Sequence, residues 1–283
     1  MLFKSLVLAA IAGVSLAAVD EGSLAVVKAD FQAAGLIGDE FQAEDFDNLE
    51  GLLHVQFDGQ DEPLTLGQRL EKDAVQQKPA FRYLPAEDAD TNGQYTLALI
   101  DADYNGADQS EGQTRHFLEN SVTIGEGDKN AEDGLPINDE DSGKVITSYA
   151  GPGPAEGSGP HRYQFLLLKQ PQDFQAPEGL DSENTPLGKM NIADYIDSTD
   201  AKIVAATFFI VEVGESTVSV KPTSTVNTAS VSATPSSTDA ASDDGDDADA
   251  QDATQDDDDD SSATKAAVSA MFMFMAVAAI VLV

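Results

Sequence analysis

The sequence of 283 residues contains no cysteine. This absence excludes disulfide bonds, thiolate catalysis and cysteine ligands for a metal ion. A folded domain of this chain must therefore depend on its hydrophobic core. The hydrophobic content of 41% is sufficient to build one, and the length predicts one folded domain with tails.

Basic residues are also scarce, with 15 Lys and Arg against 51 Asp and Glu and a formal net charge of -36. The long-range field of such a chain repels nucleic acid and anionic membrane surfaces. We therefore expect no nucleic-acid partner.

Motifs that mark common enzymes are missing from the chain. It has no Gly-x-Ser-x-Gly elbow, no His-Glu-x-x-His pair and no P-loop. Together with the missing cysteine nucleophile, this predicts that the protein is not an enzyme and needs no cofactor or catalytic metal. A hydrolase that uses Asp and His for acid–base chemistry stays an alternative.

Residues 1–18 have the features of a signal peptide. Lys4 supplies the positive charge, residues 6–16 are apolar, and residues 15–17 form a small-x-small cleavage site. This pattern predicts entry into the secretory pathway. A buried N-terminal helix is the alternative.

The last segment, 261–283, has the features of a GPI-attachment signal. Residues 271–283 are apolar but fewer than the ~20 that cross a bilayer as a helix. Small residues begin at Ser261, and a short spacer separates them from the apolar tail, so we place the attachment site at Ser261. A tail-anchor helix is the alternative, and either anchor predicts a cell-surface protein on the plasma membrane or cell wall.

Residues 217–260 are rich in Ser, Thr, Ala and Asp and predict a disordered stalk. The chain has no Asn-x-Ser/Thr sequon, so glycosylation would be O-linked. The run Asp256–Asp260 extends the stalk by self-repulsion. A calcium site there is an alternative, although no turn-forming spacing organises the ligands.

Residues 19–216 form the predicted folded domain. A short amphipathic helix is expected over 23–34 with Ser23 as its N-cap, and alternation at 53, 55 and 57 predicts a strand. Further strand patterns cover 64–67, 79–85, 94–101, 116–124, 162–168 and 202–213. The segment 94–101 is apolar on both faces and should be central. The fold class is therefore mainly β, an antiparallel β-sandwich with a few short helices.

Polar residues gather at the ends of three of these strands. Asp101 and Asp103 should share a side by the period of two, and His116 begins another strand. The Gly- and Pro-rich loop 151–160 leads into His161 and Tyr163, which share a face. Imidazoles, a phenol and a loop that can turn N–H groups inward suit a small anion. A histidine at a strand end can also be purely structural.

The segments YTLALIDADY at 95–104, RHFLEN at 115–120 and SYAGPGPAEGSGPHRYQFLLLKQP at 148–171 resemble the phosphatidylethanolamine-binding protein family. The resemblance covers about residues 20–213. It implies a β-sandwich whose small cavity binds phosphate or phospholipid head groups. The residues it implies for the cavity lining are Asp101, His116, Gly153, His161 and Tyr163. Some members of this family inhibit a serine carboxypeptidase, which gives an alternative function and partner.

The chain departs from the family pattern at three places. An Asp-Pro-Asp-Ala-Pro stretch is replaced at 101–105 by a segment without proline, and Ala155 replaces the second loop proline. Phe209 stands where the family often has a tyrosine that lines the site. We expect head-group affinity to be weaker or differently tuned.

The expected mechanism is anion binding by N–H and O–H donors of the two histidines, Tyr163 and the glycine-rich loop. Asp101 would fix a histidine tautomer or accept a proton from an amine-bearing head group. Binding should then weaken as the pH rises through about 6.5, where histidine loses its charge.

Overall fold

The computed structural model describes residues 19–103, 112–138 and 143–215. The predicted signal peptide, stalk and GPI-attachment signal lie outside these residues. Within them, no helix has the length and apolar character needed to cross a membrane.

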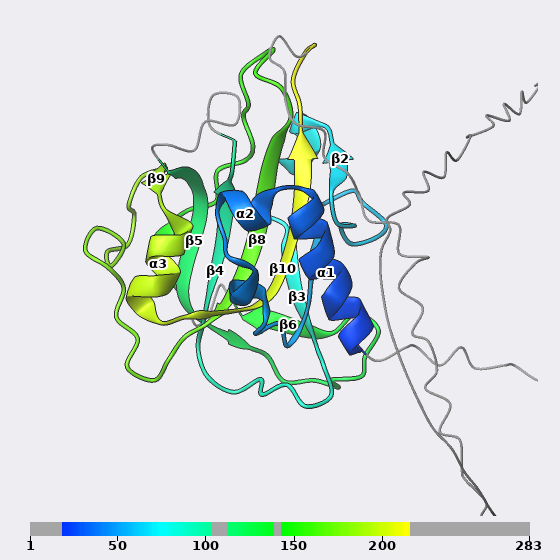
Figure 1. The fold of residues 1–283 in the computed structure, drawn as a ribbon, viewed down its shortest axis with the longest axis vertical. Helices are drawn as coiled ribbons and strands as arrows, with labels where there is room; N and C mark the ends of the chain where they lie inside the picture. Colours follow the sequence, from blue (N-terminus) through cyan, green and yellow to red (C-terminus); the bar gives the residue numbers. More distant parts are fainter. Residues whose placement is uncertain (1–18, 104–111, 139–142, 216–283) are drawn as a thin grey trace, which may run out of the picture. The chain divides into compact units, whose positions relative to one another are not determined.

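Ten strands of the described residues form one hydrogen-bonded sheet in the order β1-β3-β6-β5-β4-β8-β10-β2, with β7 and β9 paired to β5 (Figure 1). The long strands are β4 (Tyr95–Asp101), β5 (Gln113–Ile124), β8 (His161–Lys169) and β10 (Lys202–Val211). The shorter ones are β1 (Gly51–Gln56), β2 (Gln68–Leu70), β3 (Ala80–Pro85), β6 (Leu135–Asn138), β7 (Lys144–Thr147) and β9 (Gly188–Met190). All pairs are antiparallel except β10 with β2.

The sheet curls so that two apolar layers lie on its two faces. On one face, β1 and β3 pack over β4, β8 and β10 through residues that include Leu53, Tyr83, Leu97, Phe165 and Phe209. The opposite face carries the helices. The prediction of a mainly β, antiparallel sandwich with few short helices is confirmed. The two β layers of the sandwich belong to one continuous hydrogen-bonded sheet.

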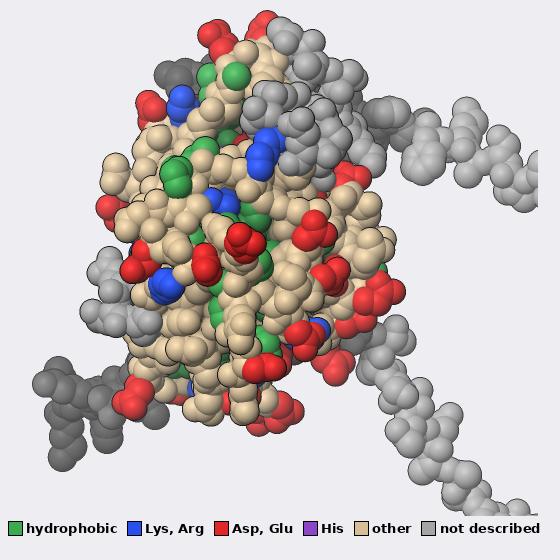
Figure 2. All heavy atoms as spheres, turned by 90° about the vertical axis from the view of Figure 1, so that its left-hand side faces the viewer, with side chains coloured by type: hydrophobic (Ala, Val, Ile, Leu, Met, Phe, Trp, Pro, Cys, Tyr) green, Lys and Arg blue, Asp and Glu red, His purple; other side chains and the backbone are tan. Residues whose placement is uncertain are grey.

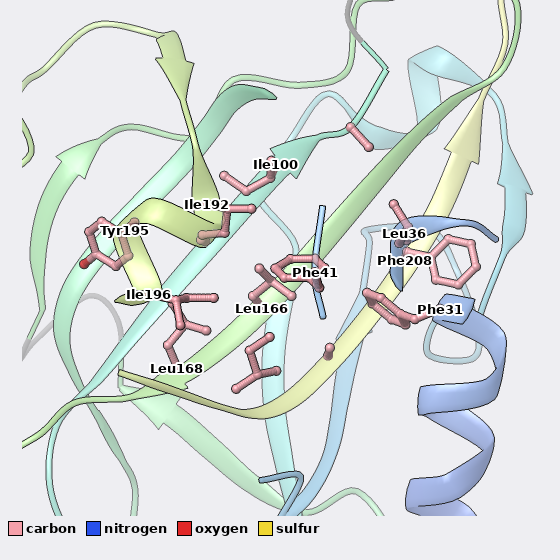
Figure 3. Packing of buried hydrophobic residues seen from close by; sticks show 14 of the residues in the cluster. Phe31, Leu36, Phe41, Ile100, Leu166, Leu168, Ile192, Tyr195, Ile196 and Phe208 are labelled. Atoms are coloured by element: carbon pink, nitrogen blue, oxygen red, sulfur yellow. The ribbon is translucent and has the colours of Figure 1, made fainter. Parts of the chain in front are cut away.

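The helices cover the second face. They are α1 (Glu21–Ala33), α2 (Leu36–Asp39), α3 (Ile192–Thr199) and the 3₁₀ turn η1 (Ala43–Phe46). A second 3₁₀ turn, η2 (Lys72–Val75), lies apart from them near β2. Figure 3 shows Phe31 of α1 beside Phe208 of β10, and Ile192 and Tyr195 of α3 beside β4 and β5. Phe41 belongs to the same buried cluster. Burying these rings removes apolar area from water, which is the main force that holds the helices to the sheet.

The strand β4 is fully buried, as its two apolar faces predict. Ala98 and Ile100 face the helices, whereas Leu97 and Leu99 face the inner layer of the sandwich. The prediction of a central strand is therefore confirmed, with β5 and β8 as its neighbours.

Several predicted boundaries are wrong. The helix α1 begins at Glu21, because Asp20 rather than Ser23 is the N-cap and accepts a hydrogen bond from the Ser23 N–H at 2.8 Å. Residues 64–67 form no strand, and the pairing with β10 begins at Gln68. The strands β6, β7 and β9 and the helix α3 were not predicted, since elements of three to eight residues give little periodicity.

A buried polar cluster attaches the N-terminal segment to β8. Arg162 Nη1 donates to the Ala34 carbonyl at 2.6 Å, and Gln164 Nε2 donates to the Glu40 carboxyl group. Burial raises the pKa of Glu40 to about 8, so this carboxyl group is largely protonated at neutral pH. Neutrality removes most of the cost of burying it.

Acidic side chains are spread over the face shown in Figure 2, with few Lys or Arg between them. The surplus of acid over base in the sequence is thus visible on the folded surface and not only in the tails. Such a surface repels nucleic acid, and the expectation that nucleic acid is not a partner stays a prediction.

Candidate functional site

A cavity of about 340 Å³ opens where β4, β5 and β8 meet the loop 151–160. Its lining consists of Asp101, Thr114, His116, Gly151, Gly153, Pro154, Ala155, Ser158, His161, Tyr163 and Leu187. All five residues that the sequence predicts for the site are among them. The structure thus brings them together, and the binding of a ligand by them stays a prediction.

Asp101 and His161 form the central polar contact of the cavity. The last residue of β4 lies beside the first residues of β8, and His161 Nδ1 is 2.9 Å from Asp101 Oδ2. A carboxylate only accepts hydrogen bonds, so Nδ1 carries the hydrogen and the tautomer is fixed. His161 Nε2 then faces the Ser158 hydroxyl at 2.9 Å.

His116 reaches the cavity because of a β-bulge. Leu99 pairs with Phe117 and Ile100 pairs with Arg115, so His116 is the extra residue of β5. A bulge turns a side chain away from the alternation of the strand. The strand begins at Gln113, three residues before the predicted start at His116.

The His116 ring is held on one side only. Its Nδ1 is 2.8 Å from the Ala150 carbonyl oxygen and therefore donates to it. Its Nε2 lies 4.0 Å from Asp101 Oδ2. Burial lowers the pKa of His116, and the attraction of Asp101 opposes this shift without overcoming it.

Tyr163 contributes a buried hydroxyl group. Within the described part of the chain this oxygen has no hydrogen-bond partner at normal distance. Burial raises the pKa of Tyr163 far above its ordinary value, and the nearby Asp101 charge raises it further. The hydroxyl therefore keeps its proton and can donate to a group in the cavity.

Phe209 lies behind Tyr163 and does not line the cavity. The two rings stack with their centroids 5.4 Å apart. A tyrosine at position 209 would stack on Tyr163 in the same way. Compared with that tyrosine, Phe209 lacks a hydroxyl group at a place next to Tyr163 rather than in the cavity lining.

Asp103 does not share a side with Asp101, and the prediction that it does is wrong. Its carboxylate accepts from the Arg162 backbone N–H at 2.7 Å and from Nε and Nη2 of the Arg162 side chain at 2.8 Å each. Arg162 points to the face opposite His161, since neighbours in a strand alternate. The period of two fails because β4 ends at Asp101, whose Oδ1 accepts from the Asp103 N–H.

The segment 72–76 holds the loop 151–160, and Tyr149 just before it, through hydrogen bonds. Gln76 Nε2 donates to the Pro152 carbonyl at 2.8 Å, and the Tyr149 hydroxyl donates to the Val75 carbonyl at 2.7 Å. A Cβ atom on Gly151 would lie 2.7 Å from Gln76 Cα. Position 151 therefore requires glycine, because the backbone of Gln76 leaves no room for a side chain.

Six lining residues are absent from the predicted set, and two of them, Gly151 and Ala155, belong to the glycine-rich loop that the sequence singles out. Thr114 lies on β5 beyond the bulge, Ser158 and Pro154 are in the loop, and Leu187 comes from the distant segment before β9. Ser158 stands three residues before His161, and this spacing was the one available signal. Leu187 is half exposed, and nothing in its local sequence connects it with the cavity.

The lining includes no lysine or arginine among the described residues. The described part of the chain also holds no group of three His, Cys, Asp or Glu side chains arranged for a metal ion. Among the described lining residues, the one acidic side chain is that of Asp101.

The fold is thus a curled, mainly antiparallel sheet with a polar cavity where β4, β5 and β8 meet the loop 151–160. Over residues 60–209 the sequence matches the family described as phosphatidylethanolamine-binding protein. The chain belongs to this family, which confirms the resemblance of its sequence segments.

Two relatives from Saccharomyces cerevisiae are similar to the chain. The uncharacterised protein YLR179C is 27% identical over 170 residues, covering 57% of this chain and 82% of that protein. The carboxypeptidase Y inhibitor is 24% identical over 190 residues, covering 57% of this chain and 84% of the inhibitor. By its name, the second relative is an inhibitor of an enzyme.

Among solved structures, the fold is similar to that of a carboxypeptidase Y inhibitor complexed with its cognate proteinase. The TM-score is 0.53 at 20% identity, and the match covers 71% of this chain and 98% of that one. At this identity the likeness concerns the fold.

The support of the loop by Gln76 leads to a stability prediction. Gly151→Ala should lower the free energy of unfolding by about 1–3 kcal/mol, because the added methyl group meets the backbone of Gln76. Gly153→Ala is the matched control, because nothing lies within 4 Å of its Cβ position, and it should change stability by less than about 0.5 kcal/mol. Urea unfolding measures both, and equal effects of the two substitutions would contradict this account of the loop.

Proposed function

We propose that the protein binds a phosphate group or a phospholipid head group in the cavity at Asp101, and that it acts by binding. The observation that supports this proposal is the convergence of His116, His161 and Tyr163 around one opening. A small, mostly preformed cavity with a few convergent polar groups is the usual form of a ligand site. The volume of about 340 Å³ is at the lower end of the common range and suits a small head group.

Four groups can bind the phosphate oxygens. The Tyr163 hydroxyl is a donor at every physiological pH, and the Gly153 N–H lies close enough to act on it. The Nε2 atom of His116 faces the cavity, because its Nδ1 is engaged with Ala150. The Nε2 atom of His161 also lines the cavity, and a phosphate oxygen would replace its 2.9 Å contact with the Ser158 hydroxyl. Each Nε2 donates to an anion when its ring is protonated and accepts when it is neutral.

Asp101 limits which anions are suitable. A dianionic phosphate beside a buried carboxylate, with no lysine or arginine in the lining, is repelled. A head group that carries an amine next to its phosphate supplies an ammonium donor for Asp101. This charge balance favours a phosphodiester with an amine over free phosphate.

The proposal predicts that binding depends on pH. Dimethyl phosphate keeps one negative charge between pH 5 and 8, so its titration reports only on the protein. Its affinity should rise as the pH falls from 7.5 to 5.5, by up to about tenfold per pH unit for each proton taken up. Burial lowers the pKa of His116 below its ordinary value of about 6.5. Most of the increase in affinity that this ring contributes therefore occurs at the acidic end of the range.

Isothermal titration calorimetry of single variants measures this effect. His161→Ala should weaken binding at pH 5.5 at least tenfold and flatten the pH dependence. His54→Ala is the control, because His54 lies on β1 outside the cavity lining. In a second arm, glycerophosphoethanolamine should bind more tightly than glycerophosphoglycerol at pH 7.5. An affinity for dimethyl phosphate that is equal at both pH values would contradict the role of the histidines.

Inhibition of a serine carboxypeptidase is a second candidate function. The similarity to the carboxypeptidase Y inhibitor supports it, over most of the length of that relative. The folded domain should then slow the hydrolysis of a chromogenic peptide by carboxypeptidase Y in proportion to its concentration. Unchanged hydrolysis at a large excess of the domain would exclude inhibition of this enzyme, and bovine serum albumin at the same concentration controls for nonspecific effects.

We also propose that the protein enters the secretory pathway and is held at the cell surface by a GPI anchor at Ser261. The residue patterns of segments 1–18 and 261–283 support this. Phosphoinositide-specific phospholipase C should then release the protein from intact cells in which it is expressed. The variant truncated after residue 260 should be secreted without the enzyme, and retention of the full chain after phospholipase treatment would favour a tail-anchor helix.

A further inference from the structure

One residue of the cavity, Ser158, has no role in the proposed binding of phosphate. Its Oγ lies 2.9 Å from His161 Nε2, and His161 Nδ1 lies 2.9 Å from Asp101 Oδ2. A hydroxyl group, an imidazole and a carboxylate are therefore connected in series. The order of atoms is the one in which an imidazole removes a proton from a serine while a carboxylate orients the ring.

The ring can act as a base only through Nε2. Asp101 accepts from Nδ1 and is 5% exposed, so it holds the ring in the tautomer whose lone pair is on Nε2. Ser158 Oγ has a second acceptor, the Ala155 carbonyl at 2.7 Å. When the ring is protonated, the hydroxyl hydrogen points to Ala155. When the ring is neutral, the hydroxyl can donate to Nε2, and this is the reactive arrangement.

The cavity also contains donors for a developing negative charge. The Tyr163 hydroxyl is buried without a hydrogen-bond partner in the described residues and keeps its proton. The Gly153 backbone N–H is a second donor in the lining, near that hydroxyl group. Donors that are already oriented in a buried site stabilise an oxyanion more strongly than water does.

We infer that Ser158 is a nucleophile that reacts with small carboxylic esters, with His161 as general base and Asp101 as positioning residue. The expectation that the protein is not an enzyme was drawn from missing sequence motifs. Such motifs do not detect a serine that a loop places beside a histidine. The inference concerns a chemical activity in addition to head-group binding and does not depend on it.

The reaction needs only the ester and water. Ser158 Oγ forms a bond to the carbonyl carbon while its proton passes to His161 Nε2. The carbon–oxygen bond to the alcohol then breaks, and the alcohol leaves with that proton. Water attacks the acyl-serine, gives its proton to Nε2, and the carbon–Oγ bond breaks. Ser158 recovers the proton, and the carboxylic acid is released.

A fluorophosphonate probe tests the nucleophile directly, because it phosphonylates activated serines irreversibly. The full chain should be labelled once, at Ser158, as located by peptide mass spectrometry. The labelling rate should increase with pH and then level off, as general-base activation of a serine requires. Ser158→Ala should abolish labelling, and Asp101→Asn should slow it at least tenfold and change the pH profile.

Ser182→Ala is the matched control, because Ser182 is an exposed serine outside the cavity lining. It should be labelled like the unchanged chain. Hydrolysis of p-nitrophenyl acetate should be at least tenfold faster with the unchanged chain than with Ser158→Ala. Absence of labelling on Ser158 in the unchanged chain would overturn the inference, and this result requires no variant to fold.

Discussion

The contact between Asp101 and His161 is the interaction on which the cavity depends. It joins the end of β4 to the start of β8, at 2.9 Å, where both side chains are almost fully buried. A buried carboxylate is costly unless it is hydrogen-bonded, so the pairing of the two strands and the pairing of the two side chains stabilise each other. The same contact fixes the His161 tautomer and turns Nε2 toward Ser158. The contact therefore determines which ring nitrogen of His161 is available to a ligand or to the Ser158 hydroxyl.

The strand β8 uses its two faces for different purposes. His161 and Tyr163 point into the cavity. Arg162 and Gln164 point to the other face, where they hold Asp103, the Ala34 carbonyl and Glu40. The N-terminal segment is thus attached directly behind the site, through residues next in sequence to those that line it.

Much of the fold could be predicted because it depends on patterns within single segments. The apolar residues of 95–101 indicate a strand buried on both faces, and the segment 148–171 carries the glycine-rich loop and His161 together. The five predicted lining residues lie near strand ends or in this loop. Polar residues at such places attract notice because the neighbouring strand residues are apolar. Short elements such as β9 and α3 escaped prediction because their stability comes from tertiary packing rather than from local periodicity.

By itself, the sequence determined the class of fold, the central strand, and the identity of the residues available for the cavity. These follow from hydrophobic alternation, from turn residues and from the types of side chain. Only the tertiary structure decided how these residues face one another. The bulge at His116 and the position of Leu187 beside the cavity arise from pairing between strands. The Asp103 carboxylate is held on the other face by Arg162, a residue 59 positions away. Because a one-residue change of register moves a side chain to the other face, geometry of this kind is set by partners far away in the chain.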